Sequence, residues 1–377
     1  MLLFLFSSLA FSTPYIIQTL KAPTQKITFR ISISQKHTLI FPPRKLYNII
    51  DCLYWFYNIF SCIMKFMKKS LRKRIWTILI AIISVLLILN LGATLYFYQI
   101  ACVRNNQPIG QVKTSSPNYS LVQKFNKLPK STETLTNNDL KLDAWYVPAE
   151  QKTNNTVIVV HGFRQDKSAM RHYGQLFHEL GYNVLMPDNR GAGNSQGNFI
   201  TFGYHDKFDV IAWAKYLTDK NPESHISLYG LSMGASTVMM ASSEKSLPSS
   251  VKNIIEDCGY TNAWDEIVYQ AKESYNIPAF PLVYSVSLES KIRQGWFFQE
   301  ASATKALAKD KLPILLIHGS KDTYVPTSMV YENYKSVKPG TPKEMLVVKN
   351  AAHARSFETN PTLYRQTISK FMKTYNP

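Results

Sequence analysis

The sequence predicts an α/β fold over residues 136–377, and three observations support this prediction. Short apolar runs typical of buried strands recur there, for example at Val157–Val160 and Val251–Asp257. Between them lie segments whose apolar residues have helical spacing, such as Gly162–Leu180. The third observation is a serine between two glycines, directly after an apolar run and directly before a helix-compatible segment.

The expected elements follow one another in a regular order. The first strand alternates apolar and polar residues, and the later strands are more continuously apolar. In chain order, the expected strands are Leu140–Val147, Val157–Val160, Asn183–Met186, a run from Ile226, Val251–Asp257, Pro313–Gly319 and Glu344–Val348. The expected helices lie within Gly162–Leu180, Phe208–Leu217 and Ala235–Ser243.

The serine lies in a G-x-S-x-G pattern over residues 230–234. A serine on a sharp strand-to-helix turn has strained backbone, and its neighbours two residues away must lack side chains so that strand and helix can approach. The pattern alone is weak, but the strand and the helix around it make it specific. We therefore predict that Ser232 is a catalytic nucleophile.

A serine hydroxyl needs a base, and the base needs a group that orients it. In this architecture they follow the serine in the order acid, histidine, each after a strand. Asp322 follows the strand Pro313–Gly319 and is the predicted acid; His353 follows Glu344–Val348 and is the predicted base. Asp257, at the end of another strand, competes for the acid role, and a structural carboxylate is its alternative interpretation.

Two backbone amides are expected to form an oxyanion hole. One is that of Met233, directly after the serine. The other is that of Phe163, in the loop after the strand Val157–Val160. His161 and His318 each precede a glycine at a strand end, where we expect them to support the backbone. No grouping of histidines indicates a metal site, so neither a metal nor a cofactor is expected.

These motifs, taken together, identify a family resemblance. The matching segments are His161–Phe163, the glycine-rich turn Asp188–Gly197, Gly230–Gly234, His318–Asp322 and the loop around His353. Residues from about 138 to 377 resemble the α/β-hydrolase superfamily, and most of all its bacterial membrane-anchored serine hydrolases near the dipeptidyl-peptidase-like branch. The resemblance implies an eight-stranded, mostly parallel sheet flanked by helices, and it does not fix a substrate. The glycine-rich turn lacks the spacing of a dinucleotide-binding loop and is expected to be structural.

More chain lies between Gly259 and Leu312 than a simple crossover needs. We expect a helical cap that lines an apolar substrate pocket, although most of its aromatic residues could instead pack the cap onto the core. Individual substrate-binding residues remain unknown at this point. The aromatic residues are Trp264, Tyr269, Tyr275, Phe280, Tyr284, Trp296, Phe297 and Phe298.

The formal charge of +18 is unevenly distributed. Residues 1–110 contain 13 Lys and Arg against one acid, Asp51, and the remainder contains 30 against 24. Most of the excess therefore surrounds a hydrophobic segment, where it indicates membrane topology rather than nucleic-acid binding. The catalytic part contains no recognisable nucleic-acid motif, and no nucleic-acid partner is expected.

The hydrophobic segment Ile75–Phe97 is long enough to cross a bilayer. It follows a basic cluster and has aromatic residues at both ends, so we expect an uncleaved, single-pass anchor in the cell membrane with the catalytic domain outside. A cleaved signal peptide is the alternative, with Gln99–Cys102 as a poor lipoprotein-type site. The basic cluster is Lys68, Lys69, Arg72, Lys73 and Arg74, and the aromatic residues are Trp76, Tyr96 and Tyr98.

Residues 1–63 show no sustained amphipathic period, and only Leu2–Leu9 resembles the apolar part of a signal peptide. We hypothesise that translation starts at Met64 or Met67 and that the upstream residues are a misassigned start. The predicted organisation is an uncertain extension (1–63), a basic region and transmembrane anchor (64–98), a polar linker (99–135) in which Tyr119–Phe125 could be helical, and a catalytic domain (136–377) with a cap at about 259–312.

The four cysteines, Cys52, Cys62, Cys102 and Cys258, have neither metal nor disulfide spacing. Only Cys258 falls within residues 136–377, so no disulfide is expected inside the catalytic domain. A buried thiol behind a strand is the expected state of Cys258.

The sequence thus predicts a membrane-anchored, extracytoplasmic serine hydrolase with a small-molecule acyl substrate. Ester cleavage is favoured over peptide cleavage, because no acidic pair is apparent that would hold a peptide amino terminus. Serine peptidase or amidase activity is the alternative within the same fold. A non-catalytic surface interaction module is the alternative outside enzymes, and the intact set Ser232, Asp322 and His353 argues against it.

Overall fold

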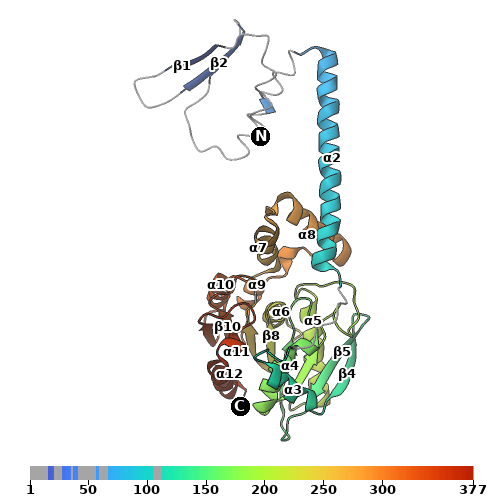
Figure 1. Cartoon of the computed structure of the whole chain (residues 1–377), viewed down its shortest axis with the longest axis vertical. Coiled ribbons are helices and arrows are strands. Elements are labelled where there is room, and N and C mark those ends of the chain that lie inside the picture. Colours follow the sequence, from blue (N-terminus) through green and yellow to red (C-terminus); the bar gives the residue numbers. More distant parts are fainter. Residues whose placement is uncertain are drawn as a thin grey trace. The chain divides into compact units, whose positions relative to one another are not determined.

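The computed structural model describes residues 16–20, 28–34, 37–40, 57–58, 67–104 and 113–376. The chain divides into two compact units, Met1–Val85 and Leu86–Pro377 (Figure 1). The first unit contains an antiparallel sheet of β1 (Ile16–Leu20), β2 (Thr28–Ser34) and β3 (His37–Ile40). The segment Leu2–Leu9 and Met64 lie outside the described residues, and the start at Met64 or Met67 stays a prediction.

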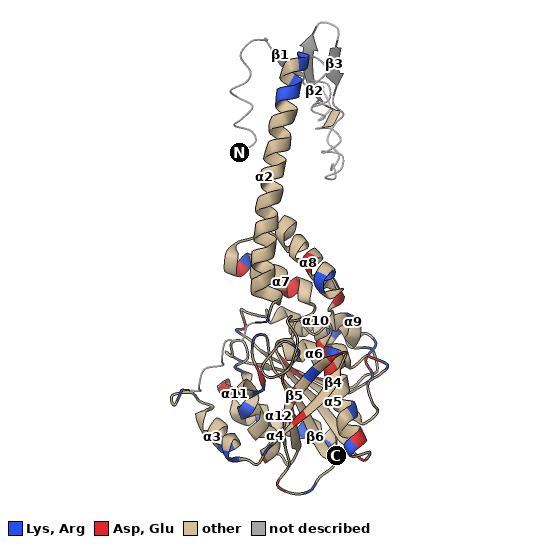
Figure 2. Ribbon diagram, turned by 90° about the vertical axis from the view of Figure 1, so that its right-hand side faces the viewer, with Lys and Arg blue, Asp and Glu red and all other residues tan. Residues whose placement is uncertain are grey.

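Helix α2 spans Lys69–Cys102 and begins in the first unit and ends in the second. Among the described residues, it is the one helix long and apolar enough to cross a membrane. Figure 2 shows its basic residues at the start and uncharged residues over the rest of its length. The predicted hydrophobic segment therefore lies within one continuous helix, which extends beyond it at both ends.

The second unit contains an eight-stranded sheet in the order β11-β10-β9-β8-β6-β7-β5-β4. Neighbouring strands from β6 to β11 are parallel, whereas β4 and β5 are antiparallel at one edge. This confirms the predicted mostly parallel eight-stranded sheet. The strands are β4 (Ser131–Asn137), β5 (Leu140–Val147), β6 (Asn155–Val160), β7 (Asn183–Pro187), β8 (His225–Leu231), β9 (Val251–Asp257), β10 (Ile314–Gly319) and β11 (Lys343–Val348).

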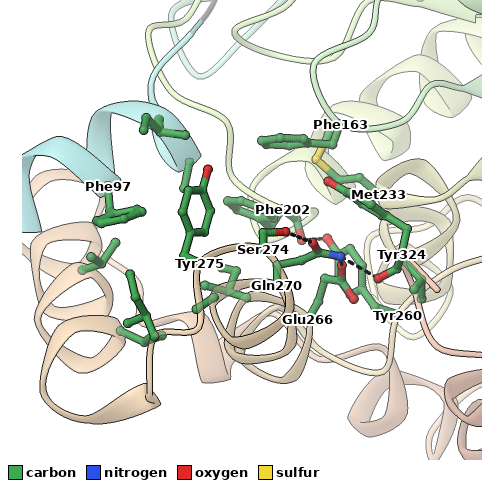
Figure 3. Close-up of a pocket in the computed structure, with 18 of the residues that line it drawn as sticks. Phe97, Phe163, Phe202, Met233, Tyr260, Glu266, Gln270, Ser274, Tyr275 and Tyr324 are labelled. Atoms are coloured by element: carbon green, nitrogen blue, oxygen red, sulfur yellow. Dashed lines mark hydrogen bonds between the residues drawn. The ribbon is translucent and has the colours of Figure 1, made fainter.

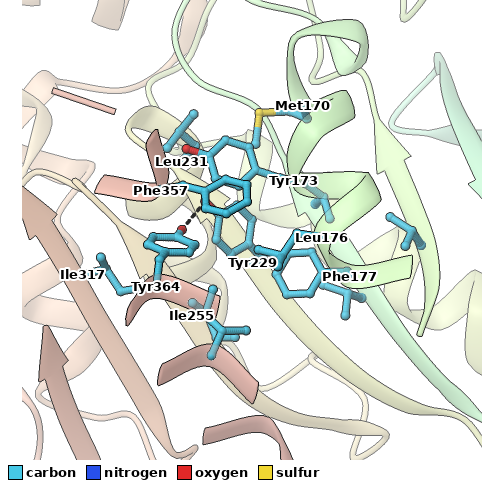
Figure 4. Close-up of a cluster of buried hydrophobic side chains, with 14 of the residues drawn as sticks. Met170, Tyr173, Leu176, Phe177, Tyr229, Leu231, Ile255, Ile317, Phe357 and Tyr364 are labelled. Atoms are coloured by element: carbon cyan, nitrogen blue, oxygen red, sulfur yellow. Dashed lines mark hydrogen bonds between the residues drawn. The ribbon is translucent and has the colours of Figure 1, made fainter. Parts of the chain in front are cut away.

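Helices cover both faces of the sheet, because central parallel strands are apolar on both sides. In β6, Val157 and Val159 contribute to one buried cluster, and Ile158 and Val160 contribute to the other. Figure 4 shows the first cluster, in which aromatic rings of helices and strands pack together. Its helices are α3 (Tyr119–Lys127), α4 (Arg171–Glu179), α11 (Ser356–Thr359) and α12 (Pro361–Tyr375). The second cluster includes α5 (Asp206–Lys220), α6 (Met233–Ala241), α9 (Ala303–Leu307) and α10 (Ser328–Ser336).

The segment between β9 and β10 forms the predicted helical cap. It consists mainly of α7 (Ala263–Tyr275), the short turn η2 (Ala279–Val283) and α8 (Tyr284–Gln294). Trp296 and Phe298 are fully buried and pack with Phe202, whereas Phe280 and Tyr284 are exposed. The cap aromatics therefore divide between packing the cap onto the core and facing outward.

The linker predicted over residues 99–135 contains the short helix considered for Tyr119–Phe125, but parts of the linker pack on the core and the sheet. Helix α3 buries Val122 and Phe125 against the core, and β4 pairs along its whole length with β5. The predicted boundary at 135/136 falls inside β4. This edge strand is polar and half-exposed, so its composition resembles that of a linker.

Cys102 also lies within the predicted linker but belongs to the packed core. It lies at the end of α2 and is fully buried in a third apolar cluster, with Tyr98, Phe202, Trp296 and Phe298. The compact second unit thus contains two free cysteines, Cys102 and Cys258. Cys258 is fully buried, as predicted.

Candidate active site

Ser232 lies in the one-residue turn between β8 and α6. Its backbone is in the positive-φ region (φ 56°, ψ −117°), which non-glycine residues rarely adopt. A Cβ atom at Gly230 would lie 2.2 Å from the carbonyl oxygen of Gly234, and one at Gly234 would lie 2.3 Å from that of Val160. The two glycines are therefore required by the close approach of strand and helix, as the sequence pattern predicts.

The structure brings Ser232, His353 and Asp322 together from three separate loops. Ser232 Oγ lies 2.9 Å from His353 Nε2, and His353 Nδ1 lies 2.7 Å from Asp322 Oδ2. The serine hydroxyl is thus placed to donate to the imidazole, which donates its other N–H to the carboxylate. This is the geometry of a nucleophile, a general base and the group that orients the base.

Asp322 is held as a carboxylate although it is buried. The amides of Tyr324 and Val325 donate to its Oδ1 at 2.9 and 3.0 Å, and His318 Nε2 lies 3.2 Å from Oδ2. Burial raises the pKa of Asp322, but the hydrogen bonds from His318 and His353 outweigh it and lower the pKa to about 2. The contact of His318 with this acid was missed from the sequence, because it depends on how the loop after β10 folds back.

The competing acid, Asp257, lies elsewhere. Its carboxylate accepts a hydrogen bond of 2.8 Å from the hydroxyl of Tyr364, which in turn lies 2.9 Å from that of Tyr229 (Figure 4). Burial raises the pKa of Asp257 to about 6. The contact with His353 Nδ1 is made by Asp322, so the geometry supports the structural interpretation of Asp257.

The two amides predicted for the oxyanion hole lie near Ser232. Phe163 and Met233 line the same cavity as the serine, and among the described residues neither amide donates a hydrogen bond within the protein. His161 supports the loop that carries Phe163: its Nδ1 lies 2.8 Å from the carbonyl oxygen of Gly162, and its Nε2 accepts from the amide of Asn189 at 2.9 Å. This is the backbone-supporting role that its position predicts.

Ser232 opens into a mainly apolar cavity of about 370 Å³, a size typical of small-molecule sites. Figure 3 shows Phe163, Met233 and Tyr324 at one end, and Phe97 with Tyr275 at the other. The cap therefore lines the pocket as predicted, together with the end of α2, which the sequence did not indicate. The lining from α2 is Phe97, Ile100 and Ala101, and that from the cap includes Glu266, Ile267, Gln270, Ala271, Ser274, Tyr275, Ile277, Leu282, Val283 and Val286.

Glu266 is the acidic residue in this lining, and its side chain is almost fully buried. Its Oε1 accepts from Gln270 Nε2 at 3.0 Å, and Oε2 has no hydrogen-bond partner in the described part of the chain. Burial raises the pKa of Glu266 to about 8, so it is mostly neutral at pH 7. The polar spacing of Glu266, Gln270 and Ser274 along α7 was the available sequence signal for this feature.

Cys258, Asp322 and His353 each place one potential metal-ligand atom within 4.8 Å of the others. The fit to a metal is poor. Burial raises the pKa of the Cys258 thiol well above its ordinary value, so the thiol is protonated. Asp322 and His353 are already hydrogen-bonded to each other. The donor set therefore suits the hydrogen-bonded chain better than a metal ion.

The glycine-rich turn after β7 forms a structural network behind the site. The Asp188 carboxylate accepts from the amides of Lys167 and Asn194 at 2.8 and 2.7 Å, and it forms an ion pair with the Lys167 side chain. A Cβ atom at Gly193 would collide with that carboxylate. These contacts use the loop's polar groups internally, in agreement with the structural interpretation.

Comparisons with known proteins agree with this fold. A family model described as serine aminopeptidase, S33, matches residues 151–266. The uncharacterized protein YqkD of Bacillus subtilis is 30% identical over 232 residues, which cover 61% of this chain and 75% of YqkD. The uncharacterized protein YfhR of Escherichia coli (strain K12) is 23% identical over 257 residues, covering 66% of this chain and 82% of YfhR.

Two solved structures are similar in fold. The esterase Pf2001 of Pyrococcus furiosus has a TM-score of 0.56 and 25% identity, over 73% of this chain and 99% of the esterase. The acylaminoacyl peptidase of Pyrococcus horikoshii has a TM-score of 0.50 and 19% identity, over 67% of this chain and 42% of the peptidase. The chain belongs to the α/β-hydrolase superfamily. Within it, the chain is an enzyme of the serine hydrolase type.

Proposed function

We propose that the protein hydrolyses carboxylic esters through an acyl-enzyme intermediate. The observation that carries this proposal is the hydrogen-bonded chain of Ser232, His353 and Asp322, whose serine end faces an apolar cavity. Such a chain activates a hydroxyl for attack on an acyl carbon.

In the proposed reaction, Ser232 Oγ attacks the acyl carbon while His353 Nε2 takes its proton. Asp322 stabilises the resulting imidazolium and stays ionised, since its pKa is about 2. The amides of Phe163 and Met233 donate to the oxyanion. His353 then gives its proton to the leaving alcohol, and a water molecule that His353 deprotonates releases the acid. No cofactor or metal takes part in this proposal.

Esters are favoured over peptides because of the cavity. Its lining is largely apolar, and the buried carboxyl of Glu266 is mostly neutral at pH 7, which suits an acyl chain better than a charged amino terminus. The similarity to an esterase also covers almost that whole chain, whereas the similarity to the acylaminoacyl peptidase covers less than half of it. Peptidase or amidase activity is the second candidate, favoured by the description of the matching family model.

We also propose that α2 anchors the chain in the cell membrane with the catalytic unit outside. Length and apolar composition support a membrane-crossing helix, and the basic cluster before Ile75 supports the orientation. The proposed partners are a small-molecule acyl ester as the substrate and the bilayer that holds α2. No nucleic-acid partner is proposed.

The test uses the full chain in detergent with p-nitrophenyl esters of increasing acyl length. Wild type should hydrolyse them, and Ser232→Ala should lose at least ~10³-fold in kcat/KM. The acyl length with the highest kcat/KM would indicate the length of the cavity. If both folded proteins are inert on esters, aminoacyl amides are tested next, and inertness there would favour a non-catalytic interaction module.

A further inference from the structure

The tip of the cap is an uncharged, exposed apolar surface. Residues 276–288 contain no Asp, Glu, Lys or Arg. Three large side chains on it are exposed: Phe280 at 74%, Tyr284 at 53% and Leu288 at 51%. They are four residues apart, and Tyr284 and Leu288 lie on one face of α8. A continuous apolar face of this kind normally contacts a partner or a membrane.

This cap tip lies directly against α2. Asn90 Nδ2 donates to Ser285 Oγ at 2.8 Å, and Ser285 Oγ donates in turn to the carbonyl oxygen of Pro281 at 3.1 Å. Farther along α2, the rings of Phe97 and Tyr275 are 5.1 Å apart. The residues of α2 beside the tip are apolar and exposed as well: Leu86, Leu87, Ile88, Leu89, Leu91 and Leu95.

The position along α2 gives the depth of the tip. At 1.5 Å per residue, about 20 residues from Ile75 cross ~30 Å of hydrocarbon and end near Thr94. Asn90 is four residues earlier, and therefore lies ~6 Å inside that boundary. Its contact with Ser285 brings the cap tip, with Phe280, to the same level. Amphipathic elements bind at the bilayer surface with their apolar face ~5–10 Å deep.

The cavity that contains Ser232 extends to the cap tip. Ile277 and Leu282, on either side of Phe280, line it together with Phe97 of α2. Its other end holds Met233 (Figure 3), the residue that follows Ser232 in the chain. An acyl chain in the bilayer beside α2 would therefore have an apolar path to the serine.

We propose that the cap tip inserts into the leaflet next to the catalytic unit, and that the substrate is a long-chain acyl ester of a membrane lipid that enters the cavity from that leaflet. This inference rests on the proposed ester hydrolysis and on α2 as an anchor. The bond between the acyl carbon and the ester oxygen breaks. Water supplies the hydroxyl of the released fatty acid and the proton of the released alcohol.

The activity test uses the full chain in phosphatidylcholine vesicles and two substrates. One is a fluorogenic oleoyl ester that resides in the bilayer, and the other is water-soluble p-nitrophenyl butyrate. Phe280→Asp/Leu288→Asp places two charges on the tip without changing a residue that lines the cavity. Its rate on the bilayer ester should fall at least ~10-fold, and its rate on the soluble ester should stay within ~2-fold of wild type. Tyr331→Asp/Leu363→Asp, at exposed positions on α10 and α12, is the matched control and should change neither rate.

A depth measurement decides the inference independently of activity. Phe280→Cys, with Cys52 and Cys62 replaced by serine, carries an environment-sensitive fluorophore, because the remaining cysteines are buried. Quenching by nitroxide lipids is expected at position 280 and not at the control Tyr331→Cys. Full bilayer-ester activity of Phe280→Asp/Leu288→Asp would overturn the inference. So would a label at 280 that nitroxide lipids do not quench, as when a second copy of the chain covers the tip.

The two proposals fail in different ways. If folded wild type hydrolyses neither ester, the proposed ester hydrolysis is wrong, and with it the substrate assigned here. The quenching at position 280 still reports whether the cap tip enters the bilayer.

Discussion

Asp322 shows how a single residue keeps its charge inside the protein. Two amides and two imidazoles surround its carboxylate, and the hydrogen bonds from the imidazoles lower its pKa to about 2 in spite of burial. The carboxylate is therefore ionised at every pH above about 4. Its charge is available to orient and stabilise His353 throughout the range in which an esterase is assayed.

Asp322→Asn should lower kcat by ~10³–10⁴-fold, because the amide cannot stabilise an imidazolium and favours the wrong tautomer of His353. Since the wild-type acid does not titrate above about pH 4, the loss should be similar at pH 6 and pH 9. The measurement is kcat on a soluble ester across that range. A loss that vanishes at either end would contradict the assigned role; Asp257→Asn, which removes a carboxylate from Tyr364 and not from His353, is the control.

The buried carboxyl of Glu266 should make the free energy of unfolding depend on pH. Its pKa is raised to about 8, so the folded state keeps a proton that the unfolded state loses above about pH 4.5. The stabilisation is therefore complete at acid pH and is lost as the pH rises toward 8. Glu266→Gln keeps a neutral side chain at every pH, so its free energy of unfolding relative to wild type should be ~4 kcal/mol higher at pH 9 than at pH 5. Denaturant titrations of wild type and Glu266→Gln at both pH values measure the free energy of unfolding. An equal change between pH 5 and pH 9 in the two proteins would contradict the raised pKa of Glu266.

At this scale, the sequence predicted the residues whose chemistry depends on motif and order. Ser232, Asp322 and His353 each follow a strand and occur in the required sequence, so their convergence could be predicted. The roles of His318 and Glu266 could not be predicted, because the first depends on how the loop after β10 folds and the second on burial of the Glu266 side chain. Neither cause is visible in local composition.

Among the elements, the turn between β8 and α6 carries a strict steric demand. Gly234→Ala would place a Cβ atom 2.3 Å from the carbonyl oxygen of Val160 and 2.7 Å from that of His161, both in rigid backbone. We predict a loss of at least ~3 kcal/mol in the free energy of unfolding. Gly92→Ala is the matched control, because no described residue outside its own helical turn comes within 4 Å of the added Cβ atom. Equal thermal stability of the two variants would show that the turn does not need glycine.

Elements with a strong apolar pattern were predicted well, and the weakly patterned ones were not. The strands from β5 to β11 were expected close to their observed bounds, because β5 alternates apolar and polar residues and the central strands β6 to β10 are almost continuously apolar. β4 was missed as an edge strand, since half-exposed residues need no apolar pattern. The last turn of α2 was assigned to a linker, because the helix was predicted from its apolar, membrane-crossing run. That run ends where the helix begins to contact the rest of the protein.

For the whole molecule, the end of α2 is part of the catalytic unit rather than a tether. Tyr98 and Cys102 are buried in the third apolar cluster, and Phe97 lines the cavity. The free energy of unfolding of a chain that starts at residue 113 should therefore be ~3 kcal/mol lower than that of the full chain. This shortened chain should also lose activity on long-chain esters. A chain that starts at Met67 is the control and should keep both properties. Equal melting temperatures of the two truncated chains in the same detergent would contradict this view.

The central claim is that Ser232 is an activated nucleophile, and fluorophosphonate labelling tests it most directly. The full chain should form a covalent adduct whose mass lies on the peptide containing Ser232, and Ser232→Ala should form none. Ser249→Ala removes an exposed serine outside the site and should label like wild type. Labelling of folded Ser232→Ala at the wild-type rate, or no labelling of folded wild type, would contradict the claim.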